Sequence, residues 1–222
     1  MAVCVLVFSF GCVKQPEETT TSIPATTTLI AATTSIECEF GEMGGQIPRD
    51  LCYYKLGISE KEPEICGKVE NQEMRDGCYY MVAVTKPDSS LCRKVEDQKG
   101  RDMCYYTLAL SRKDSSLCGV IQNQKIRDDC YFDAAIARAD YSLCTVIQNQ
   151  TLRDGCYGRL AFSRKDHVIC EKIHDPIFRD SCYSNVGAAL ADHLICGKIQ
   201  DQQKKERCRV SVTSMRETSA PQ

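Results

Sequence analysis

The sequence lacks what a large single hydrophobic core would require. It contains no tryptophan, and aromatic residues make up only 7% of its 222 residues. It also lacks an excess of charge of one sign, because 28 basic and 30 acidic residues leave a net charge of -2. Nucleic acids and anionic membrane surfaces select strongly basic patches. We therefore expect neither a nucleic-acid-binding protein nor one large globular core.

The motifs of metal, haem and thiol-redox sites are missing as well. Structural zinc sites and thiol-redox enzymes use Cys-x-x-Cys spacing, whereas even the closest cysteines of the repeats, such as Cys118 and Cys130, are much further apart. Only three histidines occur, His167, His174 and His193. No stretch combines a nucleophile, a general base and a phosphate-binding loop. We expect no metal, no cofactor and no catalytic residue, and hence not an enzyme.

Cysteine is abundant, and it recurs with a strict rhythm. From Cys52 to Cys208 a longer interval, such as that from Cys52 to Cys66, alternates with a shorter one, such as that from Cys66 to Cys78. The resulting fixed 26-residue period is typical of repeat arrays, in which each small unit buries its surface against its neighbours. Units of this size need neighbours or covalent staples to fold. The predicted fold is therefore an all-α solenoid of 26-residue repeats.

Each copy carries the same pattern around one cysteine, illustrated by Cys130. Arg127 and Asp128 precede this cysteine by three and two residues, Tyr131 follows it, and the small residue Ala135 comes five residues later. The cysteine and the first, fourth and fifth residues after it fall on one face of a helix. This long helix should begin at an Asn or Asp, the preferred N-cap residues, seven residues before the cysteine: Asn71, Asp97, Asn123, Asn149, Asp175 and Asp201.

A second, short helix is predicted after the long one. Acidic capping residues recur ten residues after each cysteine: Glu62, Asp88, Asp114, Asp140, Asp166 and Asp192. The residues from Ser115 to Ile121 then have a narrow apolar edge, so the repeats should be αα-hairpins. We expect the Arg of the Arg-Asp pair to reach backbone carbonyls or a neighbouring acid between repeats; a ligand-binding role is the alternative.

The last copy departs from the pattern. Lys205 and Glu206 replace the Arg-Asp pair, and Arg209 replaces the tyrosine. A polar, atypical terminal unit is what the end of a solenoid requires.

Sixteen cysteines in an exported protein indicate disulfides, and two connectivities fit the spacing. Pairs that close the longer interval would leave Cys38 and Cys208 unpaired at opposite ends of the array. Pairs that close the shorter interval leave Cys38 and Cys52, which can join each other, so this alternative is favoured. Its pairs are Cys38–Cys52, Cys66–Cys78, Cys92–Cys104, Cys118–Cys130, Cys144–Cys156, Cys170–Cys182 and Cys196–Cys208. Each bridge should contribute about 3 kcal/mol by closing a short loop.

The N-terminal segment predicts export. Residues 1–11 form an apolar run that resembles a secretory signal peptide and is too short to span a bilayer. The Gly11-Cys12 end resembles a lipobox, the bacterial and archaeal signal after which the cysteine becomes a lipidated N-terminus, so Cys12 is the predicted lipidation site. Simple cleavage and an anchor helix from a longer N-terminus are the alternatives. Residues 12–36, rich in threonine, should form an extended stalk similar to those of archaeal surface lipoproteins.

Two kinds of residue are candidates for binding or modification. The second residue after the cysteine is aromatic in the first four copies: Tyr54, Tyr80, Tyr106 and Phe132. Such a row of aromatic side chains could bind a protein or a glycan, and packing against the next repeat is the alternative. Asn149-Gln150-Thr151 is a glycosylation sequon at a predicted turn, so Asn149 is the predicted glycosylation site.

Paired helices with a regular cysteine in each helix resemble the Sel1-like αα-repeat proteins of bacteria over residues 38–208. Sel1-like units are longer and have a different Gly/Ala pattern, so the resemblance implies the architecture alone. The Arg-Asp-x-Cys-Tyr pattern is also similar to cysteine-rich repeats in archaeal surface proteins.

Together these features predict a non-enzymatic lipoprotein on the outer face of the cell membrane. Residues 37–216 would form the solenoid and residues 217–222 a disordered tail. The solenoid would be a scaffold that binds an extracellular protein or glycan. A purely structural envelope spacer and a secreted thiol-redox factor are the alternatives.

Overall fold

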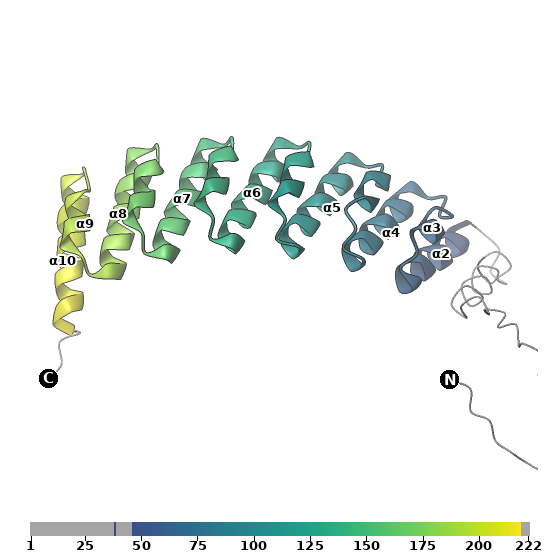
Figure 1. Ribbon diagram of the computed structural model, residues 1–222, viewed down its shortest axis with the longest axis horizontal. Coiled ribbons are helices and arrows are strands. Elements are labelled where there is room, and N and C mark those ends of the chain that lie inside the picture. Colours follow the sequence, from purple (N-terminus) through teal and green to yellow (C-terminus); the bar gives the residue numbers. More distant parts are fainter. Residues whose placement is uncertain (1–37, 39–45, 219–222) are drawn as a thin grey trace, which may run out of the picture.

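The computed structural model describes residue 38 and residues 46–218, whose helices stand side by side in a single bowed row (Figure 1). All regular structure in this part of the chain is helical, which confirms the predicted all-α solenoid. The predicted signal peptide, Cys12 and the threonine-rich stalk lie outside the described residues.

The row alternates long and short helical segments. The long helices are α2 (Gln46–Glu60), α4 (Gln72–Thr85), α5 (Gln98–Ser111), α6 (Gln124–Arg138), α7 (Gln150–Arg164), α8 (Pro176–Leu190) and α10 (Gln202–Thr218). The short segments are α3 (Pro63–Cys66), η1 (Leu91–Lys94), η2 (Ser115–Val120), η3 (Tyr141–Val146), η4 (His167–Lys172) and α9 (His193–Gly197). We call a short segment and the long helix that follows it a unit. The last helix, α10, runs two residues past position 216, the expected end of the solenoid.

The long helices begin where the Asn and Asp residues predict. In α6 the backbone N–H of Ile126 donates to Asn123 Oδ1 at 3.1 Å, which satisfies one of the unpaired amides of the first turn. The other predicted N-caps accept a bond of the same kind: Asn71, Asp97, Asn149, Asp175 and Asp201. The predicted helix starts are therefore confirmed at all six positions.

The short segments differ from the expected short α-helices. Segments η1 to η4 are 3₁₀-helices of four to six residues, and only α3 and α9 among the short segments are α-helical. Most of them are capped as predicted; the N–H of Ser116, for example, donates to Asp114 Oδ1 at 3.1 Å, but Glu62 makes no such bond. 3₁₀-helices occur mainly as short pieces of this kind, and the α-helical α3 and α9 show that the same position in the repeat can also form an α-helical turn.

Disulfides form the centre of each unit. Seven bridges join the pairs that the shorter cysteine interval favours, together with Cys38–Cys52, and their Cα–Cα distances lie between 5.5 and 5.8 Å. In the central units the cystine sulfurs are fully buried beside aliphatic side chains such as Leu108 and Leu160. Cystine therefore supplies much of the interior that aromatic residues supply in larger domains.

The small residue five places after each cysteine lies against a disulfide. A Cβ added to Gly57 would lie 2.8 Å from the Sγ of Cys78 and 3.0 Å from the Sγ of Cys66, the bridge of the following unit. At Gly187 the distances to the sulfurs of Cys196 and Cys208 would be 3.4 Å. The small residue thus leaves room for the disulfide of the next unit.

The number of disulfides indicates an oxidising compartment outside the cytoplasm, because cytosolic thiols are kept reduced. Within the described residues, none of the helices has both the length and the hydropathy needed to span a bilayer.

Candidate functional site

The Arg-Asp pairs hold the loop that precedes each long helix. Asp128 of α6 is buried, and its two carboxylate oxygens accept the backbone N–H groups of Gln148 and Asn149 in the next unit, each at 2.9 Å. Arg127 donates to the carbonyl of Ile121 at 2.7 Å, in the loop before its own helix. The N–H groups of each loop are therefore bound by the preceding unit, and a carbonyl of the loop is bound by the arginine of its own unit from α4 to α8.

The same aspartate contact recurs at every described step of the row, from Asp50, Asp76, Asp102, Asp128, Asp154 and Asp180. The arginines reach backbone carbonyls as expected, but these carbonyls lie within the arginine's own unit and not between repeats. Arg75 also pairs with an acid of the next unit, Glu96, at 2.9 Å. We did not predict the reach of the aspartate into the next unit, because its partners are backbone amides 20 and 21 residues away.

A second set of arginines also joins neighbouring units. Arg112, Arg138 and Arg164 each donate to a backbone carbonyl at the end of the preceding long helix, at 2.8 to 2.9 Å. These arginine contacts were not predicted from the sequence. Their signal was present, because an arginine stands eight residues after the cysteine in three successive copies.

The four predicted aromatic residues are half-buried against the next long helix. The hydroxyl groups of Tyr80 and Thr107 are 3.0 Å apart and share a hydrogen bond, and the hydroxyl of Tyr106 donates to Asp133. Tyr54 packs beside Gly77, and Phe132 packs against the interior. Packing against the next unit therefore accounts for much of each ring, and the remaining face of Tyr80 and of Phe132 lines a groove.

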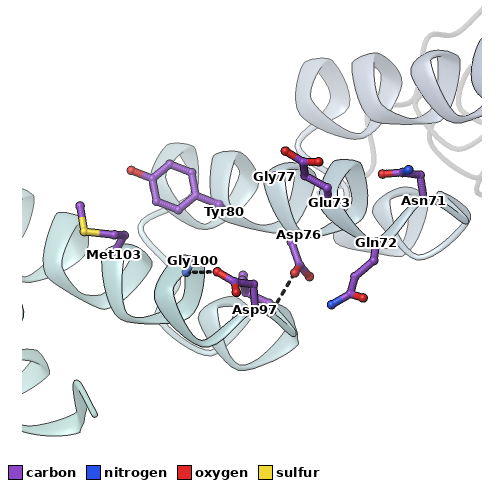
Figure 2. Close-up of a pocket in the computed structure, with 10 residues that line it drawn as sticks. Asn71, Gln72, Glu73, Asp76, Gly77, Tyr80, Asp97, Gly100 and Met103 are labelled. Carbon is purple, nitrogen blue, oxygen red and sulfur yellow. Dashed lines mark hydrogen bonds between the residues drawn. The ribbon is translucent and has the colours of Figure 1, made fainter. Parts of the chain in front are cut away.

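The first groove lies between α4 and α5 and has a volume of about 610 Å³. Tyr80 and Met103 lie toward one end of it, and Asn71 and Gln72 toward the other (Figure 2). The remaining lining residues are Glu73, Asp76, Gly77, Val95, Asp97 and Gly100. The groove thus combines an aromatic ring and a thioether with polar side chains at its edge.

An equivalent groove of about 780 Å³ lies two units further along, between α6 and α7. Phe132 occupies the position of Tyr80, and Leu152 and Gly155 take those of Gly100 and Met103. The remaining lining residues are polar or charged: Gln124, Lys125, Asp128, Asp129, Gln148, Asn149 and Thr151. Since Gly155 has no heavy atom within 4 Å of an added Cβ, its missing side chain leaves this groove open.

Two further features affect the chemistry of this face. Burial, followed by the hydrogen bond to Asp133, raises the pKa of Tyr106 to about 12, so its hydroxyl stays protonated and remains a donor. Asn149, the predicted glycosylation site, is exposed at the edge of the second groove, and its Oδ1 accepts the N–H of Leu152 at 2.9 Å. Whether it carries a glycan stays a prediction.

Among the described residues, no three His, Cys, Asp or Glu side chains gather closely enough to hold a metal ion. The site is therefore described by its aromatic and polar lining alone.

Comparison with known proteins identifies no relative of this chain. No family model matches the sequence, and neither a curated protein nor a solved structure matches it significantly. The resemblance to Sel1-like proteins accordingly stays an expectation about architecture.

Proposed function

We propose that the protein is a non-enzymatic cell-surface scaffold that binds an elongated protein or glycan along its long helices. In this proposal a lipid on Cys12 anchors the chain, and residues 12–36 hold the solenoid away from the membrane. The observation that carries it is the recurrence of an aromatic-lined groove at equivalent positions two units apart.

The lining of the grooves suits a ligand with both apolar and hydrogen-bonding groups. Aromatic faces such as those of Tyr80 and Phe132 provide contact area at little cost in conformational entropy. Amides around them, including Gln72 and Gln148, can both donate and accept hydrogen bonds. Concave sites with a few polar groups at the edge are typical of ligand binding.

The spacing of the grooves favours an extended ligand. Neighbouring helices pack about 8–10 Å apart, so grooves two units apart are separated by about 16–20 Å. A peptide strand rises about 3.3 Å per residue, so roughly six residues would reach from one groove to the other. Disulfides and aspartate contacts hold the units in place before binding, which lowers the entropic cost of engaging both grooves.

Filling the second groove tests the proposal. Gly155→Leu places an isobutyl group in open space, so the helix is retained while the groove is occupied; Gly155→Ala is the matched control. The disulfide-intact chain would be used to capture ligands from a membrane and surface extract, and the affinity for the captured ligand would then be measured. We expect at least about a tenfold loss of affinity for Gly155→Leu and less than about a twofold change for Gly155→Ala.

Two outcomes would contradict binding through this groove. Equal affinity of all three proteins would place the ligand elsewhere on the molecule. Failure to capture a saturable ligand would favour the alternative, a spacer in the cell envelope.

The anchor is tested separately with Cys12→Ser. The wild-type chain should partition with membranes and carry the added mass of a lipid, and the variant should be released in soluble form. Continued membrane association of the Cys12→Ser chain would refute a lipid on this residue.

A further inference from the structure

The groove between α8 and α10 has a different chemistry from the two aromatic grooves. Its volume is about 260 Å³, and its lining consists of Ser181, Ser184, Asn185, Lys204 and Arg207. A water molecule takes up about 30 Å³ in the liquid, so there is room for a small polyatomic ion with part of its hydration. All five lining side chains are polar, and two of them are cationic.

The lining residues occupy the same repeat positions as those of the other grooves. Ser184 stands where the first and second grooves have Tyr80 and Phe132. Lys204 replaces Gly100 and Leu152, and Arg207 replaces Met103 and Gly155. Three positions on two helices therefore change together, from aromatic, other apolar or glycine residues to hydroxyl and cationic ones.

Capping of the solenoid does not account for this change. A terminal unit needs a polar outer face, but Lys204 points back into the row. Its ammonium donates to the carbonyl of Ile177 at 3.3 Å and to Ser181 Oγ at 3.4 Å, both on α8. Val210 occupies the repeat position of Tyr80 and Phe132, whose side chains face the next unit, and it is 62% exposed. Lys204 thus lies on the side of α10 that faces α8, and Arg207, whose side chain is exposed, lines the same groove.

The positive charge of this groove is not neutralised within the described part of the chain. No carboxylate of these residues lies within 4.0 Å of the Lys204 ammonium or the Arg207 guanidinium. Asp180 accepts the N–H groups of Gln200 and Asp201, and Asp201 itself caps the N–H of Lys204.

Glu206, the remaining acid of the first turns of α10, lies 3.9 Å from Arg209. The Nε of Arg207 donates to the carbonyl of Gln203 at 3.4 Å, which leaves the two terminal nitrogens of its guanidinium for another acceptor.

We infer that this groove binds an oxyanion: a sulfate, phosphate or carboxylate group. The guanidinium fork can donate two parallel hydrogen bonds, the ammonium supplies a point charge, and the serine hydroxyls complete the set of donors. The site depends only on α8 and α10, so it stands independently of the aromatic grooves.

A titration at constant ionic strength tests the inference. Backbone amide shifts of residues 181–185 and 204–207 would be followed by NMR in the full-length, disulfide-intact protein as sodium chloride is exchanged for sulfate, phosphate or acetate. We expect saturable shifts confined to these segments. The tetrahedral anions sulfate and phosphate and the planar acetate are titrated in separate experiments. The anion with the lowest dissociation constant identifies the group that the site selects.

Two kinds of variant separate a built site from general attraction to positive charge. Arg207→Gln should weaken binding by about tenfold, whereas Arg209→Gln, which removes the same charge from the same helix outside the groove, should change it by less than about twofold. Ser184→Tyr restores the aromatic residue of earlier units and should abolish binding without removing a charge.

Several results would overturn the inference. Shifts that grow linearly without saturation, or an equal loss in Arg207→Gln and Arg209→Gln, would show non-specific screening. Unchanged binding in Ser184→Tyr, with helix content equal to that of the wild type, would place the anion outside the groove.

Discussion

At the residue scale, the buried aspartates are the polar groups on which the array depends most. Burying a carboxylate is unfavourable unless hydrogen bonds compensate for the lost hydration. Asp128 has two backbone donors from the next unit and a third bond from the side chain of Gln124, at 2.8 Å. The Asp128 carboxylate therefore accepts hydrogen bonds from two backbone N–H groups of the next loop.

Replacing this carboxylate by an amide should loosen a single junction. In Asp128→Asn one oxygen can still accept a bond, but the new NH₂ group faces the second backbone N–H. We expect a loss of about 2–3 kcal/mol at this junction. Native-state hydrogen exchange at the amides of Gln148 and Asn149 would measure it, with Asp129→Asn, whose carboxylate pairs with exposed Lys125, as the control. Equal exchange rates in the two variants would refute the assignment.

Tyr106 should titrate later than an ordinary tyrosine. Its pKa is raised to about 12, first by burial and then by the hydrogen bond to Asp133. A pKa raised in the folded state stabilises the protein below the unfolded value of 10.0, and this contribution is lost as the pH rises through about 12. Ultraviolet absorbance of tyrosinate would follow the titration. Asp133→Asn should lower the pKa of Tyr106 part of the way, because burial remains; an unchanged titration would contradict the hydrogen bond.

At the element scale, the ends of the long helices carry local strain. Ala139 and Lys165 follow α6 and α7 with φ of 52°, and Ala191 follows α8 with φ of 50°. This left-handed conformation closes the helix but favours glycine, because a Cβ approaches the neighbouring backbone. Because none of these three residues is glycine, each adopts its positive φ at a cost in backbone strain.

The same substitution two residues apart should therefore have opposite effects. Ala139→Gly should stabilise its unit by about 0.5 kcal/mol by relieving the positive φ. Ala137→Gly, at an exposed position inside α6, should destabilise it by about 0.5–1 kcal/mol. Urea unfolding of the two variants, with all disulfides intact, would compare them. Effects of equal sign would contradict the role given to backbone strain.

The elements show which features the sequence could predict. Helix starts depend on contacts three residues away, such as that of Asn123 with Ile126, so the capping residues located them. The pairing of Cys118 with Cys130 followed from counting. The 3₁₀ geometry of the short segments could not be predicted, because their apolar edge also fits an α-helix. The grooves could not be predicted either, because their shape depends on how residues of two units, such as Phe132 and Gly155, lie relative to each other.

At the scale of the whole molecule, the disulfides replace a continuous core. Each of the six bridges from Cys66–Cys78 onward spans 12 residues, and closing such a loop contributes about 3 kcal/mol. Because each bridge lies within one unit, its loss should weaken that unit before it affects the rest of the row.

Removing one central bridge should reveal this local effect. We expect Cys118→Ala with Cys130→Ala to cost about 3 kcal/mol and to speed hydrogen exchange mainly in η2 and α6. Removing Cys196 and Cys208 at the end of the row should leave α6 unaffected. Uniform acceleration over the whole chain in either double variant would show that the units do not open separately.

The contacts that join one unit to the next have a consequence for the length of the molecule. The aspartate and arginine contacts between units described above join residues 20 to 25 positions apart, so each unit senses only its immediate neighbour. Inserting or deleting one 26-residue copy inside the row keeps the aspartate contact at each junction, because its partners are backbone amides. The span of the protein can therefore grow or shrink in fixed steps through gene duplication or loss while this contact is kept.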